Sequence, residues 1–190
     1  MSRPFLLLFV CLLSSQVYAH ETLVAGGFTA GLSHPVLGLD HLLAMLSVGM
    51  LSAQIGGRAI WTLPATFVVV MLIGGLLGMD GVEIFSVELG IAMSVLMLGL
   101  AIAMDRRFSP LLTLYFVGFF AIFHGHAHGT EMPTLAEPEA YTMGFVAGTA
   151  GIHLVGVAIG AVAQKSAQGM KLLRYGGGLI ALAGAYLIIS

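Results

Sequence analysis

Long apolar runs, separated by short polar connections, follow one another along most of this chain. Five of them, at roughly 59–79, 85–104, 109–128, 141–163 and 169–189, are each about long enough to cross the ~30 Å hydrocarbon core of a membrane as a helix. The connections leave no room for a soluble domain. The pattern therefore predicts an all-α fold, a polytopic bundle of transmembrane helices.

A sixth span precedes these five and contains a proline. We expect 22–54 to form one broken transmembrane helix, with the break at His34 and Pro35, because a proline disfavours helical backbone at the residue before it. The helix then resumes at Gly38. Broken helices are tolerated at membrane depth where they line a cavity, and in transporters they often carry the binding site. The sequence leaves open whether 22–33 spans, re-enters or lies on the membrane.

Residues 1–19 have the pattern of a cleavable signal peptide: a positive charge near the start, a short apolar stretch and a small-residue cleavage site. An uncleaved anchor is the competing interpretation. Cleavage would leave 20–190 as a single transmembrane helical domain that begins outside the cytoplasm at His20, whose role the sequence does not assign. Cys11, the only cysteine, lies in the signal, so the mature chain has no disulfide and no thiolate metal site.

The composition excludes a soluble protein. Hydrophobic residues make up 58% of the chain and charged residues only 8%, whereas soluble domains are about 25% charged. No phosphate-binding loop with glycine and lysine occurs, so we do not expect this chain alone to drive transport with ATP. The chain is therefore interpreted as an integral protein of the lipid bilayer.

The charged residues indicate the orientation of the chain. The cations of the mature chain lie in the first, third and fifth connections: Arg58, Arg106, Arg107, Lys165, Lys171 and Arg174. By the positive-inside rule these connections are cytoplasmic, which places the N-terminus outside, as an exported signal requires. Most acids lie at the opposite face: Glu21, Asp80, Glu83, Glu88, Glu131, Glu137 and Glu139. This acidic rim either concentrates cations or consists simply of solvated loop residues.

A polar cluster interrupts the first span. His34, Asp40 and His41 lie within eight residues of one another. A charge buried in lipid costs roughly 2.5–3.5 kcal/mol or more, so such a cluster indicates a functional site. Asp40 and His41 are adjacent and should diverge by ~100° on a helix. Asp40 is therefore either a metal ligand itself or the group that orients a histidine from another helix.

Four further histidines lie in the fourth and fifth spans. His124 and His128 are four residues apart, so they share one helix face and have the spacing to hold one divalent ion. His126 points away from them and receives no role. His153 lies in the middle of its span on the side of small residues, so it points at another helix; a hydrogen-bonded core histidine is the alternative interpretation.

These groups lie at similar depths. With the N-terminus outside, the first and fourth spans both carry their histidines near the outer face, and His153 lies ~18 Å along its helix. We therefore expect the three groups to form a site for one divalent transition-metal ion between the outer third and the midplane of the membrane. Imidazole suits nickel, copper, zinc and iron, and the residues alone do not choose among them.

The motifs of this chain resemble the HupE/UreJ family, membrane proteins associated with the nickel enzymes hydrogenase and urease and regarded as nickel or cobalt permeases. The matching residues are His34-Pro35-x-x-Gly38-x-Asp40-His41 with Ala44-Met45, then Phe123-His124-Gly125-x-Ala127-His128-Gly129-x-Glu131, then His153. The resemblance covers the whole mature chain. It implies metal-binding roles for His34, Asp40, His41, His124, His128 and Glu131. It also implies a multi-pass protein of the bacterial inner membrane that supplies the maturation proteins of a nickel enzyme.

The leading hypothesis is therefore a permease, not an enzyme, whose cargo is Ni²⁺ or Co²⁺ and which holds no tightly bound cofactor. We expect no nucleic-acid partner, and a homo-oligomer is left open. The alternative is an intramembrane hydrolase that holds Zn²⁺ with the same histidines and aspartate and keeps an open water site. A membrane haem protein with paired histidines as axial ligands is a third hypothesis.

Overall fold

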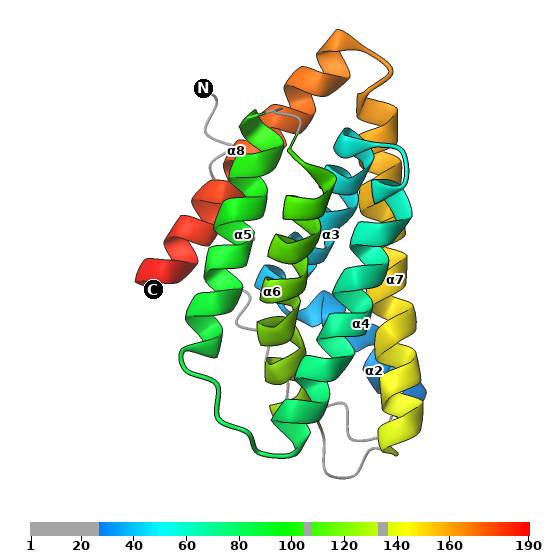
Figure 1. Ribbon diagram of the computed structural model, residues 1–190, viewed down its shortest axis with the longest axis vertical. Coiled ribbons are helices and arrows are strands. Elements are labelled where there is room, and N and C mark those ends of the chain that lie inside the picture. The colour runs from blue at the N-terminus through cyan, green and yellow to red at the C-terminus, as the bar shows by residue number, and fades with distance from the viewer. Residues whose placement is uncertain (1–26, 105–107, 133–136) are drawn as a thin grey trace, which may run out of the picture.

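The computed structural model describes residues 27–104, 108–132 and 137–190, and within these ranges the regular structure is entirely helical (Figure 1). The helices are α2 (Gly27–Leu37), α3 (Leu39–Ile55), α4 (Ala59–Met79), α5 (Val87–Met104), α6 (Pro110–Thr130), α7 (Pro138–Ala163) and α8 (Ala167–Ile189). The predicted signal peptide, Cys11 and His20 lie outside the described residues.

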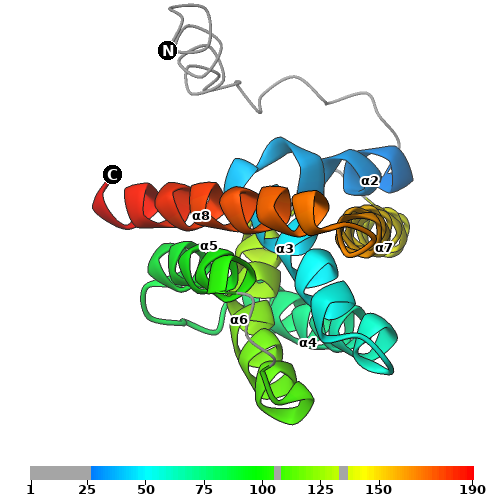
Figure 2. The same ribbon diagram turned by 90° about the horizontal axis from the view of Figure 1, so that it is seen from above.

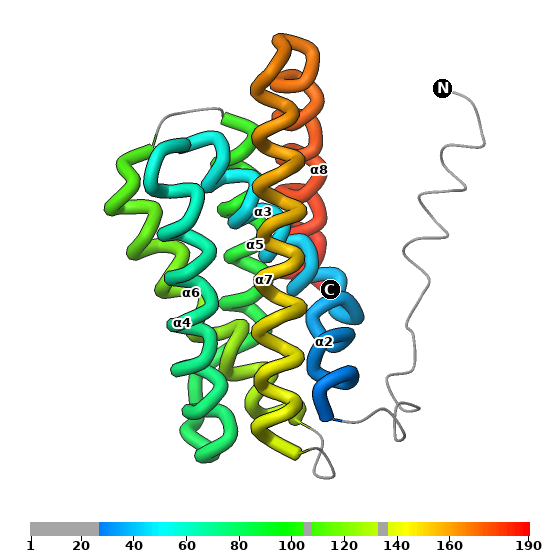
Figure 3. The backbone as a smooth tube through the Cα atoms, turned by 90° about the vertical axis from the view of Figure 1, so that its right-hand side faces the viewer, coloured from blue at the N-terminus to red at the C-terminus, as the bar shows by residue number. Residues whose placement is uncertain are grey.

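The predicted transmembrane bundle is confirmed. Five helices, α4 to α8, are each long and apolar enough to cross a membrane, and α2 and α3 together make a sixth candidate, bent by 83°. The bounds of α4 to α8 agree closely with the five runs read from the sequence. The pair α2–α3 begins at the lower end of the molecule and finishes at the upper end, so it traverses the bundle once (Figures 1 and 3). The protein is therefore a polytopic membrane protein.

The break in the first span lies at Gly38, and the predicted break at His34 and Pro35 is wrong. Both residues are inside α2, and Gly38 is extended, with φ −89° and ψ 116°. The restriction that proline imposes on the preceding residue is a preference, which packing here overcomes: Pro35 is buried and lies beside Gly148 of α7.

Glycine at position 38 allows the chain to turn there, because the side chains that follow fold back over it. A Cβ at Gly38 would lie 3.0 Å from Asp40 Oδ1 and 3.2 Å from His41 Nδ1. Any larger residue would displace these two side chains. The turn therefore begins α3 and at the same time places the polar groups of its first turn.

Helix α3 lies at the centre of the bundle and packs on α4, α5 and α7 (Figure 2). Ala44 and Met45 are fully buried and Val48 is 1% exposed. The outer helices are arranged in close pairs, α4 with α6, α5 with α8, and α2 with α7. The polar first turn of α3 is therefore enclosed on most sides by protein and not by lipid.

Helix α2 packs along α7 (Figure 3). Gly31 of α2 meets the backbone of Tyr141, and Gly144 and Gly148 of α7 meet the carbonyl groups of Phe28 and Leu32. Small residues permit this approach of two backbones in lipid. The segment 27–37 is therefore part of the bundle, which answers for these residues the question that the sequence left open.

The connections between the helices lie at the two ends of the bundle. The α3–α4 and α7–α8 turns, which contain Arg58 and Lys165, lie at the upper end in Figure 1, and the α4–α5 and α6–α7 connections lie at the lower end. Asp80, Glu83, Glu88, Glu131, Glu137 and Glu139 are all exposed and belong to the lower end. This arrangement agrees with the predicted topology, in which the lower end is outside.

Candidate metal centre

Side chains from four helices converge near the lower end of the bundle, and their histidine rings form a continuous row. The ring centroids of His34 and His128 are 4.8 Å apart, those of His128 and His41 are 4.2 Å apart, and those of His41 and His124 are 4.8 Å apart. These four histidines therefore contact one another and do not face in different directions. The row begins at α2, passes between α6 and α3, and ends deep within the bundle.

The outer end of the row is a three-residue cluster. One ligand atom each from His34, His128 and Glu131 lies within 4.8 Å of the other two. His34 Nε2 is 3.5 Å from Glu131 Oε2, and their side chains are 24% and 56% exposed. Hydrogen bonding to His34 lowers the pKa of the Glu131 carboxyl, so this group is an anion at neutral pH. The cluster thus offers two imidazoles and a carboxylate to an ion arriving from water.

Asp40 and His41, in the first turn of α3, form the part of the row that follows the outer cluster. Asp40 Oδ1 accepts hydrogen bonds from the backbone N–H of His41, at 2.8 Å, and from His41 Nδ1, at 2.9 Å. The carboxylate lies in the first turn of α3, where the helix dipole favours a negative charge. Asp40 therefore orients the adjacent histidine and not one from another helix. The ~100° divergence of adjacent residues on a helix did not predict this contact. It forms because the short Asp40 side chain folds back to the N–H of the next residue in the first turn of α3.

The inner end of the row consists of His124 and His153, which are 0% and 1% exposed. The ring of Phe67, from α4, contacts both, with its centroid 5.4 Å from that of His124 and 5.1 Å from that of His153. His124 Nε2 is 2.8 Å from Ser94 Oγ of α5. His153 faces the bundle, as its small-residue side predicted.

Several nitrogens along this row have no protein partner. They are buried and comprise His41 Nε2, His124 Nδ1, and both ring nitrogens of His128 and of His153. Buried polar atoms in folded proteins nearly always have a hydrogen-bond partner. A run of imidazole nitrogens with free bonding capacity is the donor set that borderline divalent metals prefer.

All seven residues singled out in the sequence belong to this row or its two ends: His34, Asp40, His41, His124, His128, Glu131 and His153. His126 faces away, as expected, and its Nε2–H donates to the carbonyl oxygen of Val82 at 2.6 Å. Sequence reasoning missed Ser94 and Phe67. The only signal for Ser94 was a single hydroxyl within an apolar span, and Phe67 had none.

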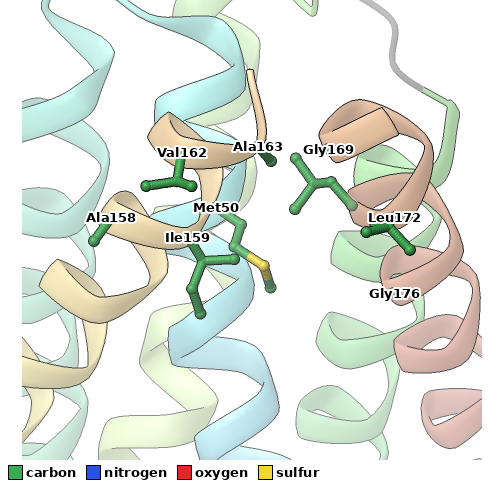
Figure 4. A pocket seen from close by; sticks show the side chains of 9 residues that line it. Met50, Ala158, Ile159, Val162, Ala163, Gly169, Leu172 and Gly176 are labelled. Atoms are coloured by element: carbon green, nitrogen blue, oxygen red, sulfur yellow. The ribbon is translucent and has the colours of Figure 1, made fainter. Parts of the chain in front are cut away.

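Toward the opposite end of the bundle, the side chains that line a groove are apolar. An apolar groove of about 570 Å³ lies between α7 and α8, with Met50 of α3 at its base (Figure 4). Its walls include Ile159, Val162 and Leu172, and no titratable side chain lines it. The groove therefore has no imidazole or carboxylate with which to hold a divalent ion.

Comparison with known proteins agrees with these features. The family model described as "HupE / UreJ protein" matches residues 8–187. "Protein HupE" of Rhizobium leguminosarum bv. viciae is 42% identical over 178 residues, which cover 94% of this chain and 93% of that protein. No solved structure matches the chain. The chain therefore belongs to the HupE/UreJ family, whose members are accessory or transport proteins and not enzymes.

Proposed function

We propose that this protein is a secondary permease of the bacterial inner membrane that imports a divalent transition-metal ion, Ni²⁺ or else Co²⁺. One observation carries the proposal: the row of histidine rings leads from the partly exposed His34 to the fully buried His124 with no gap above 4.8 Å between neighbouring ring centroids. A structural core would not need such a row. A path for an ion does.

Capture takes place at the acidic end. Exposed carboxylates surround the mouth of the row and raise the local concentration of cations. Glu131, His34 and His128 then replace part of the hydration shell of the ion. Transport also requires that the ion be released, so the outer cluster must bind it only weakly, and a site of imidazole and carboxylate without thiolate is compatible with this.

Transfer inward uses His128 as the shared ligand. Its ring contacts both His34 and His41, and neither of its nitrogens has a protein partner. An ion held by the outer cluster therefore reaches His41 without leaving His128. Beyond His124 the ion passes Phe67 to reach His153. A negative-inside potential drives this movement, by about 2.3 kcal/mol per charge per 100 mV and so by about 4.6 kcal/mol for a dication.

The choice of nickel or cobalt follows from the family. Imidazole also suits copper, zinc and iron, and the geometry of the row does not discriminate among these ions. The name of the family links it to proteins of hydrogenase and urease systems, and a nickel enzyme needs a nickel supply. Its maturation proteins are the proposed recipients of the imported ion.

Neither alternative function gains support. A hydrolase is not favoured, since the family consists of accessory and transport proteins. A haem needs its macrocycle between two facing histidines, yet the histidines here pack ring against ring at 4.2 to 4.8 Å.

Uptake of radiolabelled nickel by cells that produce the protein tests the proposal. His41→Ala and His128→Ala are expected to abolish uptake at equal protein abundance, because each removes a step of the row. His126→Ala is the matched control, since His126 is buried on the same helix but faces Val82. Uptake that survives both ligand variants would refute the proposed path. One zinc ion retained through purification, with no uptake by the wild type, would refute transport and support the hydrolase.

A further inference from the structure

Ser94 lies in α5, outside the histidine-bearing helices, and its side chain contacts the row. It is fully buried. Its Oγ is 2.7 Å from the carbonyl oxygen of Ile91 and 2.8 Å from His124 Nε2. Two partners therefore share one hydroxyl group.

The protons of these two contacts can be assigned by elimination. A hydroxyl has one proton, and a carbonyl oxygen only accepts. Ser94 O–H therefore donates to Ile91, and the Ser94 oxygen accepts the proton of His124 Nε2. A neutral imidazole carries a proton on one nitrogen only, so Nδ1 of His124 is left with its lone pair.

The free nitrogen of His124 suits a ligand of the metal path. Nδ1 is buried and has no protein partner. The ring stands at 90° to the ring of His41, with 4.8 Å between centroids. His41 shows the same arrangement with the nitrogens exchanged, because Asp40 holds its Nδ1–H and its Nε2 has no protein partner. Each histidine thus has one nitrogen fixed by the protein and one available to an ion.

We infer that Ser94 is a positioning residue of the metal path. It holds His124 as the Nε2–H tautomer and thereby presents the Nδ1 lone pair to a divalent transition-metal ion. A metal-bound histidine commonly donates its other ring N–H to an oxygen acceptor, which fixes the tautomer and ring orientation. The role of Ser94 rests on the proposed function, since it matters only if His124 binds the ion.

The chain offers a matched control in Ser52 of α3. Ser52 is also fully buried, and its Oγ donates to the carbonyl of Gly49 at 2.7 Å, the same three-residue spacing as in Ser94. The structure gives it no histidine contact. Ser52→Ala therefore removes an equivalent hydroxyl without touching the row. Ser94→Thr is the conservative variant, because a threonine hydroxyl in a helix makes the same local bond to a carbonyl.

The first measurement is ¹⁵N NMR of the full-length, metal-free protein labelled at histidine, at a pH where the buried rings are neutral. The resonances of His124 are those lost in the His124→Gln variant. We expect a protonated Nε2 in the wild type and in Ser52→Ala, and a mixture of tautomers in Ser94→Ala. A wild-type His124 protonated at Nδ1 would mean that Ser94 donates to the ring, and would overturn the inference.

The second measurement is nickel affinity, by calorimetry on the purified variants. Ser94→Ala is expected to weaken binding about 10- to 100-fold, Ser94→Thr to restore it to within a few-fold, and Ser52→Ala to leave it unchanged. Equal affinities for Ser94→Ala and Ser52→Ala would overturn the role of Ser94. Nickel binding absent from the wild type would instead refute the proposed function, and the tautomer measurement, which uses no metal, separates the two failures.

Discussion

The close contact between α2 and α7 should set the position of His34, and Gly148→Ala tests this. A Cβ at Gly148 would lie 2.5 Å from the carbonyl oxygen of Leu32 and 3.4 Å from Pro35 Cγ. These two residues flank His34 on α2. The added methyl group therefore acts directly on the backbone that carries the outermost histidine of the row.

The size of the displacement follows from the contact. Ordinary contact begins at 3.4 Å, so α2 has to move from α7 by about 0.9 Å at Leu32. His34 Nε2 is 3.5 Å from Glu131 Oε2 before this movement. A misplacement of about 1 Å costs up to ~100-fold where geometry is critical, and we expect nickel binding to weaken about 10-fold.

The control is Gly151→Ala on the same helix, where a Cβ would meet nothing within 4 Å. Replacing a helical glycine by alanine stabilises by about 1 kcal/mol in both variants. Overpacking opposes this by about 1–3 kcal/mol in Gly148→Ala alone. Gly148→Ala should thus remain folded, with stability near that of the wild type or up to about 2 kcal/mol lower.

Calorimetric titration with Ni²⁺ in detergent, beside thermal unfolding, gives both quantities. Gly144→Ala extends the series, because its Cβ would overlap the carbonyl of Phe28 and should displace α2 further. If folded Gly148→Ala binds nickel as tightly as Gly151→Ala, then either α7 does not position His34 or His34 is not a ligand. Either result refutes this reasoning.

Two further predictions concern the ends of the row. Phe67→Leu should raise the rate of nickel uptake several-fold, because a smaller side chain obstructs the ion less between His124 and His153, the two histidines that the ring contacts; uptake at the wild-type rate would contradict this. The pKa of the Glu131 carboxyl is lowered by its hydrogen bond to His34, so Glu131 is an anion at pH 7.5 and still at pH 5.5. Glu131→Gln removes this charge with little change in the size of the side chain, and it should weaken nickel binding several-fold at both pH values. An unchanged affinity at either pH would contradict the assignment of Glu131 to the outer cluster.

The sequence determined the features of this protein that depend on local chemistry. The apolar runs were long enough to specify the transmembrane helices, since each span must satisfy its own backbone hydrogen bonds in lipid. The i,i+4 spacing of His124 and His128 placed both on one helix face. The small residues on the same face as His153 correctly predicted that its side chain points into the bundle. Polar residues are so costly in an apolar span that their presence alone marked the site.

Tertiary structure decided what depends on contacts between helices. The bend lies at Gly38 and not at Pro35, because Pro35 of α2 packs beside Gly148 of α7. The order of the rings along the row, and the places of Phe67 and Ser94 beside it, result from how α3, α4, α5 and α6 pack together. Such contacts join residues distant in sequence, and no local pattern of residues encodes them.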